Sequence, residues 1–345
     1  MRFRGLDLIK QLATELALAK DQVARTVKLF DEGNTLPFIA RYRKEVTGGL
    51  DEEQLRLLDE RLTYLRNLEA RKEEVLRSIE EQGKLTPELA QAIREATIRQ
   101  EVEDYYLPFR PKRRTRATKA KEQGLEPLAT IMWAQELITG DAREIATPYL
   151  RPDLGIEDPD QALAGAMDII AEQIADEAEW RKIIREYLWE KALLASELKK
   201  EEAEAEVYRQ YHQYSEPVKR IPPHRVLALN RGEKEGCLKV GLQLENAPLL
   251  RQLEALIIKN QASIFTPFLK TTIEDSLNRL ILPSIEREIR AKLTEVAEEQ
   301  AIKVFGLNLR QLLLQPPVRG KTILGIDPGF RTGCKVIVVD AIGRI

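Results

Sequence analysis

Apolar residues recur at helical spacing near the start of the chain. Two short helices are predicted, with apolar positions at Leu8, Ile9, Leu12 and Leu16 in the first and Val23, Val27 and Phe30 in the second. A turn near residues 19–20 separates them. Asp21 can cap the second helix and Gly33 can end it. The pattern predicts a helix-turn-helix-like start.

Two interpretations of this start are open. In a DNA-binding helix-turn-helix, the second helix would enter a groove with Gln22, Arg25 and Lys28. Phosphate would be repelled by the acidic neighbours Asp21, Asp31 and Glu32. A plain helical hairpin accounts for the same apolar pattern and is preferred.

A longer charged helix is predicted to begin after Asp51. Its apolar stripe is narrow, with a 3-4-3 spacing of Leu55, Leu58, Leu62 and Leu65. Gly83 ends this helix, and Thr86 caps the next one with Pro87 in its first turn. A long helix with one narrow apolar stripe is expected to brace two parts of a protein.

Further along, residues 125–205 are predicted to be wholly helical. A β-hairpin is predicted at 225–244, because "RVLALN" and "CLKVGLQL" flank a turn with two glycines. Helices are expected again from about residue 248 to 314, and a second hairpin follows residue 321. The predicted fold class is therefore mainly α, a multi-part helical scaffold with a small β-hairpin insert.

Four parts are expected along the chain. They are a helix-turn-helix-like start with a long bracing helix (1–75), a helical region with a basic segment at 108–121 (76–205), the β-hairpin and further helices (206–318), and a truncated domain start (319–345). At 345 residues the chain is long enough for two or three cores.

Composition excludes several classes of protein. The 54 basic and 56 acidic residues nearly cancel, so the overall charge names no partner. No signal peptide and no uncharged run near 18 residues is found, so we expect a soluble cytoplasmic protein without membrane contact. Cys237 and Cys334 are expected to be reduced thiols, and His212 and His224 lack clustered ligands, so no metal site is predicted.

A Walker-like string at 319–322, "RGKT", carries no nucleotide-binding prediction. The first glycine of the motif would fall at Gln315, and the string follows a helix and precedes a strand, which is the reverse order. No cofactor is expected.

One segment is strongly biased in charge. "YYLPFRPKRRTRATKAKEQG" has no acid between Tyr105 and Lys121 but contains seven cations: Arg110, Lys112, Arg113, Arg114, Arg116, Lys119 and Lys121. Cations beside Tyr105, Tyr106 and Phe109 are what single-stranded nucleic acid needs, for phosphates and for bases. Arginines that clamp acidic helices of the same chain would explain the segment equally well. Both interpretations stay open.

The string "KTILGIDPGFRTGCKVIVVDAIGRI" predicts the second hairpin, with Asp327 at a strand end before a Pro-Gly turn. An aspartate there is typical of the first metal ligand in RNase H-like nucleases. Two-metal chemistry needs several carboxylates around ions about 4 Å apart. Asp340 is expected opposite residue 321, about 20 Å from Asp327, so Asp327 is predicted to be at most a vestigial carboxylate.

Several long strings resemble the Tex family of bacterial transcription accessory proteins. They include "LPFIARYRKEVTGGLDE", "LPFRPKRRTRATKAKEQGLEPLA", "YSEPVKRIPPHRVLALNRGEKEG" and "LGIDPGFRTGCK". The resemblance covers essentially the whole chain as the N-terminal half of that family. It implies a YqgF (RNase H-like) domain beginning near residue 319, followed in the family by helix-hairpin-helix elements and an S1 domain.

The resemblance implies a transcription-associated factor that binds nucleic acid (RNA or single-stranded DNA) without catalysing a reaction. RNA polymerase or other transcription machinery is the protein partner considered. An RNase H-like nuclease or resolvase is an alternative, which further carboxylates would support. A pure protein-interaction scaffold is another, favoured if the basic segment is buried against acidic helices.

Overall fold

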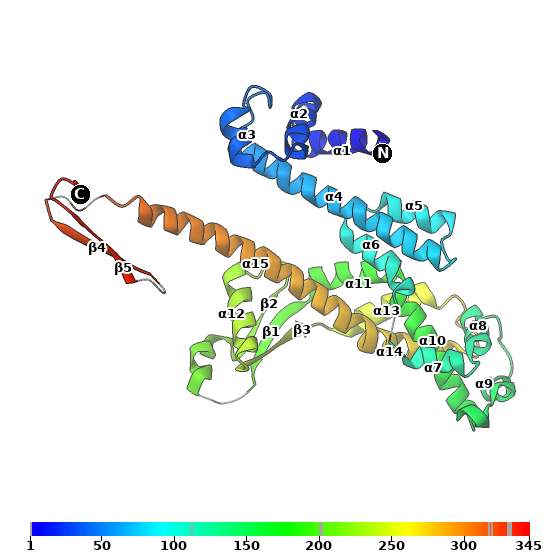
Figure 1. Cartoon of the computed structure of the whole chain (residues 1–345). Helices are drawn as coiled ribbons and strands as arrows, with labels where there is room; N and C mark the ends of the chain where they lie inside the picture. Colours follow the sequence, from blue (N-terminus) through cyan, green and yellow to red (C-terminus); the bar gives the residue numbers. More distant parts are fainter. Residues whose placement is uncertain (1, 112, 200–202, 317, 319, 330–332) are drawn as a thin grey trace. The chain divides into compact units, whose positions relative to one another are not determined.

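The structure, a computed structural model, describes residues 2–111, 113–199, 203–316, 318, 320–329 and 333–345. Helices dominate the described chain and its strands form small antiparallel sheets, which confirms the mainly α class (Figure 1). The chain divides into two compact units. The first comprises Met1–Glu186 with Asn246–Pro283, and the second comprises Tyr187–Glu245 with Ser284–Ile345.

The first unit is entirely helical in its described part. Its α-helices are α1 (Arg2–Glu15), α2 (Lys20–Asp31), α3 (Leu36–Tyr42), α4 (Glu52–Glu81), α5 (Pro87–Glu95), α6 (Arg99–Tyr106), α7 (Arg116–Glu122), α8 (Glu126–Ala134), α9 (Ala142–Ala146), α10 (Pro159–Asp176), α13 (Asn246–Ile257) and α14 (Thr266–Asp275). Short 3-10 segments are η1 (Leu107–Phe109), η2 (Thr147–Tyr149) and η3 (Pro152–Leu154), and η5 (Ser276–Ile281) is a π-helix.

Two further helices, α11 (Ala178–Lys191) and α15 (Leu282–Leu313), begin in the first unit and end in the second. The second unit also contains β1 (Leu193–Leu198), η4 (Ala203–Tyr211), β2 (Gln213–Pro217), α12 (Pro223–Lys234), β3 (Leu238–Gln243), β4 (Ile323–Gly329) and β5 (Gly333–Val339).

Helix α4 braces the N-terminal part of the first unit, as its sequence predicts. The Asp51 side chain accepts a hydrogen bond from the Gln54 backbone N–H at 2.8 Å and so caps the helix. The predicted leucine stripe is buried and packs with α1, α2 and α3. Further along, Leu68, Val75 and Ile79 form a second apolar cluster with α5 and α6. One helix therefore serves two adjoining cores.

The second unit contains a three-stranded antiparallel sheet of order β2-β1-β3. Strand β1 lies in the stretch predicted to be wholly helical, so that prediction is wrong at residues 193–198. "LLASEL" consists mostly of good helix formers. It is a strand because it lies in the middle of the sheet and pairs with β2 and β3 on both edges, and such tertiary pairing overrides local propensity.

The predicted β-hairpin at 225–244 is wrong in its first strand. "RVLALN" lies in α12, which begins with Pro223 at an N-terminal helical position. Only the "CLKVGLQL" half is a strand, β3, and it pairs with β1. Gly236, at φ +78°, provides the left-handed residue after the helix. Gly232 is helical, and a Cβ there would lie 2.6 Å from the Leu238 Cδ1, so its role is close packing.

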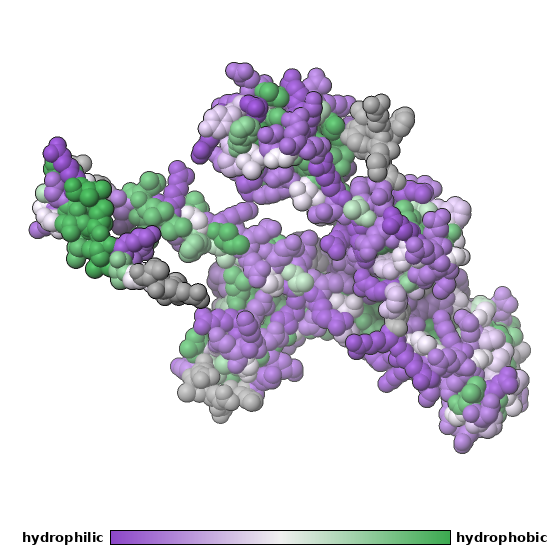
Figure 2. All heavy atoms as spheres, in the orientation of Figure 1, coloured by the Kyte–Doolittle hydropathy of each residue, from purple (hydrophilic) through white to green (hydrophobic). Residues whose placement is uncertain are grey.

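Helix α15 has two halves of different character. Its first half packs in the second unit with Ile285, Ile289 and Leu293 buried, and Glu286 accepts a hydrogen bond from the Leu242 backbone N–H at 3.1 Å. From residue 298 its side chains are exposed, including the apolar Ile302 and Phe305. Figure 2 shows apolar surface on this half and on the β4–β5 hairpin. Even so, the described helices include none with the length and apolar character needed to cross a membrane.

Candidate nucleic-acid interface

The basic segment connects α6 to α7 through irregular backbone. After η1 the chain is extended at Arg110, as two prolines at 108 and 111 predict. Helix α7 begins after Thr115, whose Oγ1 accepts a hydrogen bond from the Thr118 backbone N–H at 3.0 Å. Ala117 and Ala120 are buried on the side that packs on α10. Because these side chains are small, α7 lies close to α10. The charged side chains of α7 remain exposed.

Three of the seven cations are paired with acids of the same unit. Arg110 donates to Glu103 at 2.7 Å, Arg114 donates to Glu122 at 2.7 Å, and Lys121 lies 3.9 Å from Glu126. These ion pairs support the clamp interpretation for Arg110 and Arg114. Glu103 and Glu122 stand only seven and eight residues from their partners, so both acids were within reach of prediction from the local sequence.

The other described cations of the segment are Arg113, Arg116 and Lys119, which we call the open cations. All three are exposed, and within the described chain none forms an ion pair. Arg116 and Lys119 are three residues apart on α7 and so share a face. Lys112 lies outside the described residues. The open cations are the part of the predicted site that can meet phosphate.

The aromatic residues before the charges are mainly packing groups. Tyr105, Tyr106 and Phe109 are half-buried against the apolar cluster of α4, α5 and α6. The Tyr106 hydroxyl lies 3.0 Å from the Ser78 hydroxyl, and the guanidinium carbons of Arg71 and Arg110 stand 5.3 and 5.8 Å from its ring centroid. Base stacking by Tyr106 is thus blocked by arginines of the same unit.

Glu103, on α6 just before the basic segment, is the carboxylate on which several arginines converge. Burial acts to raise the pKa of Glu103, but the hydrogen bonds from Arg71 and the charges of Arg71, Arg110 and Arg99 outweigh it and lower that pKa. The Arg71 side chain donates to both Glu103 oxygens, at 2.7 and 3.0 Å. Glu103 stays ionised and holds Arg110 on the protein.

A cleft of about 460 Å³ adjoins the basic segment, which contributes Pro108 and Lys121 to its lining. Its charged lining is mostly acidic: Glu126, Glu172, Asp176 and Glu177. Behind α7, burial raises the pKa of Asp168, against the opposing charges of Arg279 and Arg116. An acidic cleft repels phosphate, so this cleft is a poor phosphate site, and the charge of Arg116 is partly offset by Asp168.

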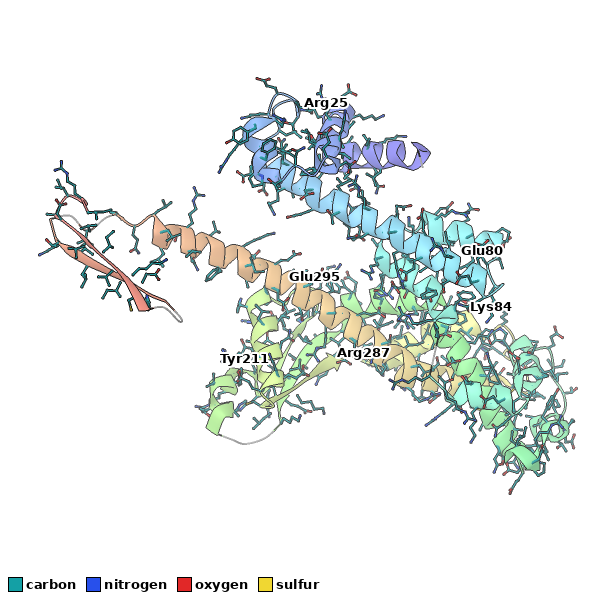
Figure 3. All side chains as sticks on the ribbon, viewed as in Figure 1. Arg25, Glu80, Lys84, Tyr211, Arg287 and Glu295 are labelled. Atoms are coloured by element: carbon teal, nitrogen blue, oxygen red, sulfur yellow. The ribbon has the colours of Figure 1, made fainter. Side chains whose placement is uncertain are left out.

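On α2, Arg25 and Lys28 are exposed, and Figure 3 labels Arg25. Gln22 has a different role, because its Nε2 donates to the Gly48 carbonyl at 2.9 Å. Gln22, which a groove-entering helix would present to DNA, therefore stabilises the turn at Gly48.

Asp327 is exposed on β4 and its strand partner is Lys335. The predicted hairpin is confirmed, with its register shifted by one residue: Ile323 pairs with Val339, so Asp340 lies beside residue 322. Five residues of strand separate Asp340 from the level of Asp327, about 17 Å. The Asp340 carboxylate accepts hydrogen bonds from the Ile342 and Arg344 backbone N–H groups. Nowhere in the described chain do three His, Cys, Asp or Glu residues gather as a possible metal site.

Comparison with known proteins identifies the family. Residues 6–80 match the family described as "Tex-like protein N-terminal domain", and residues 138–305 match "Tex central region-like". The two matches together cover well over half of the chain. The chain belongs to the Tex family.

Similar full-length proteins come from distant organisms. "Uncharacterized protein YdcI" of Bacillus subtilis is 47% identical over 98% of this chain, and "Transcriptional accessory protein Tex" of Neisseria gonorrhoeae is 42% identical over 99%. The human "S1 RNA-binding domain-containing protein 1" is 30% identical over 98%. The chain spans 47%, 45% and 35% of these relatives, less than half of each.

Proposed function

We propose that this chain is the nucleic-acid-binding N-terminal half of a transcription accessory factor, and that it acts in the cytoplasm as a scaffold without catalysing a reaction. The open cations Arg113, Arg116 and Lys119 are the observation that carries the proposal. The names of the relatives support it, since one is called a transcriptional accessory protein and another an S1 RNA-binding domain-containing protein.

The ligand is single-stranded nucleic acid, RNA or DNA, held by its phosphates. Phosphate contacts carry no sequence information, so the segment binds many sequences alike. RNA polymerase or other transcription machinery is the proposed protein partner. The hairpin β4–β5 is proposed to begin an RNase H-like domain in which Asp327 is vestigial, and α1–α2 to form a helix-turn-helix-like start.

The test removes the open cations as a set. Arg113→Gln/Arg116→Gln/Lys119→Gln should abolish most binding of a single-stranded RNA by the segment. For single strands the slope of log affinity against log salt is about −0.7 per phosphate neutralised, so three lost contacts should flatten it by about 2.

A matched control removes the three paired cations. Arg110→Gln/Arg114→Gln/Lys121→Gln takes away the same charge from the same segment but from side chains already engaged with acids. This control should change the salt slope by less than half as much. Equal effects of the two variants, or no effect of the first, would refute the assignment.

A further inference from the structure

A second cluster of cations and rings, exposed except for the half-buried Phe38, lies on α3 and the turn after it. It consists of Phe38, Arg41, Tyr42, Arg43 and Lys44, which we call the α3 platform. Tyr42 is 65% exposed, an unusual state for a tyrosine ring in this chain. Phe38 and Tyr42 are four residues apart on one face of α3, with ring centroids 5.3 Å apart. Ile39, on the neighbouring face of α3, is buried in the core.

The cations of the platform are free of ion pairs within the described chain. Arg41, Arg43 and Lys44 are exposed, and the Arg43 guanidinium carbon lies 5.1 Å from the Phe38 ring centroid. Elsewhere in the same unit, arginines near acids are paired with them, as for Arg61 with Glu15 and Arg66 with Asp31. Glu45 is the acid within the turn, so the local charge remains positive.

The turn that carries these cations is rigidly held. The Lys44 carbonyl accepts hydrogen bonds from the Thr47 hydroxyl at 3.0 Å and from the Gly49 backbone N–H at 2.9 Å. Gly48 and Gly49 have φ of +69° and +85°, and Gln22 of α2 binds the Gly48 carbonyl. A preorganised surface loses less entropy when a ligand binds.

We propose that the α3 platform is a stacking site for single-stranded nucleic acid, separate from the open cations. The exposed ring of Tyr42 beside these cations matches an unstacked base joined to phosphates, whereas Phe38 is half-buried and its ring is covered by Arg43. A duplex keeps its bases stacked and offers no face to Tyr42. An acidic peptide would use the cations but not the ring. The inference rests on the proposed nucleic-acid function. It adds a base-stacking contact that the basic segment lacks.

The test compares the whole 345-residue chain as Tyr42→Ala and as Tyr42→Phe. The probes are a uridine-rich single-stranded RNA and an abasic strand of equal length, which keeps phosphates and lacks bases. Tyr42→Ala should weaken RNA binding about 5- to 30-fold, which corresponds to about 1–2 kcal/mol, and leave abasic-strand binding unchanged. Tyr42→Phe should stay within about twofold of the parent, because the ring remains.

The charge arm uses Arg41→Gln/Arg43→Gln/Lys44→Gln. This variant should weaken both probes and flatten the salt slope by about 2. The matched control is Arg251→Gln/Lys259→Gln/Lys270→Gln, three exposed cations near α13 and α14, and it should change neither. Thermal melts of all variants identify any loss of folding.

Two outcomes would overturn the platform. One is equal RNA affinity for Tyr42→Ala and the parent. The other is tight binding of a polyglutamate peptide that depends on the three cations but not on Tyr42, which would make the platform a protein-docking surface. The assignment to the basic segment fails separately: if the open-cation variant binds RNA normally while Tyr42→Ala does not, the basic segment is excluded and the platform stands. If the parent chain binds no RNA at all, the proposed function itself fails.

Discussion

Asp104 and Arg181 form an almost completely buried ion pair, with each side chain 4% exposed. The Asp104 Oδ1 accepts from the Arg181 Nε at 3.2 Å and from an Arg185 Nη2 at 2.8 Å. Asp104 stands on α6 directly before the basic segment, and the two arginines stand on α11. This carboxylate therefore fixes the start of the basic segment to another helix of the first unit.

Replacing Asp104 should strongly destabilise the chain. Asp104→Asn removes a buried carboxylate charge that faces Arg181 and Arg185, and breaking a buried ion pair typically costs about 3–5 kcal/mol. The control is Asp160→Asn. Asp160 accepts hydrogen bonds from Arg143 through both of its oxygens, but both side chains of this pair are more than 60% exposed. The control should lose about 1 kcal/mol or less in urea unfolding. Similar losses in the two variants would contradict a structural role for the buried pair.

The stability contribution of Glu103 should depend on pH. Its lowered pKa means that the folded state favours the ionised form, so the contribution is present above the ordinary value of 4.5 and is lost as pH falls through the lower, folded value. Glu103→Gln should reduce the free energy of unfolding by about 1–2 kcal/mol at pH 7. The difference from the parent should shrink in acid.

Melting temperatures of the Glu103 variant and the parent, measured between pH 3 and 7, check this. Glu80→Gln changes an exposed acid on α4, the helix that carries Arg71, and Glu80 has no ion pair among the described residues, so this control should leave the melting temperature unchanged at pH 7. A Glu103→Gln deficit that persists undiminished at pH 3 would show that the lost contact is not ionic.

The sequence was informative where local rules decide structure. Asp51 as a cap, the leucine stripe of α4 and Thr86 as the cap of α5 are all as expected, since capping and helical periodicity depend on neighbours in the chain. The open cations lie within the predicted basic segment, because a run of like charges can be seen from neighbouring residues in the chain. The pairing of Arg110 depends on Glu103, which stands on a different helix, whereas Arg114 pairs with Glu122 at the end of α7.

Prediction failed where partners distant in sequence decide structure. "LLASEL" is a strand only because β2 and β3 flank it. In "PPHRVLALNRG" the signal was available, because Pro223 at the helix start and Gly236 after its end are typical helix boundaries. Tyr42 was missed as a surface ring, since sequence alone does not show that Ile39 takes the buried face of α3.

Gly232 and Gly306 should respond to alanine with opposite signs. In α12 a Cβ at Gly232 would overlap the Leu238 side chain at 2.6 Å, so Gly232→Ala should destabilise by about 1–3 kcal/mol. In α15 a Cβ at Gly306 meets nothing within 4 Å, so Gly306→Ala should stabilise by about 0.5–1 kcal/mol through helix propensity. Thermal melts of both variants measure these two changes in stability. A neutral Gly232→Ala would argue against the close contact of α12 with β3.

The last prediction concerns cleavage of nucleic acid. Metal-dependent phosphoryl transfer needs carboxylates that converge on ions about 4 Å apart. Asp327 stands opposite Lys335, and Asp340 is about 17 Å along the ribbon with its Oδ1 engaged by two backbone N–H groups. We therefore expect this chain to leave single-stranded, duplex and branched nucleic acids intact in Mg²⁺ or Mn²⁺. Asp327→Ala is the control that separates intrinsic cleavage from a contaminant. Cleavage by the parent that disappears in Asp327→Ala would mean that Asp327 is a working ligand, and the nuclease alternative would replace the scaffold.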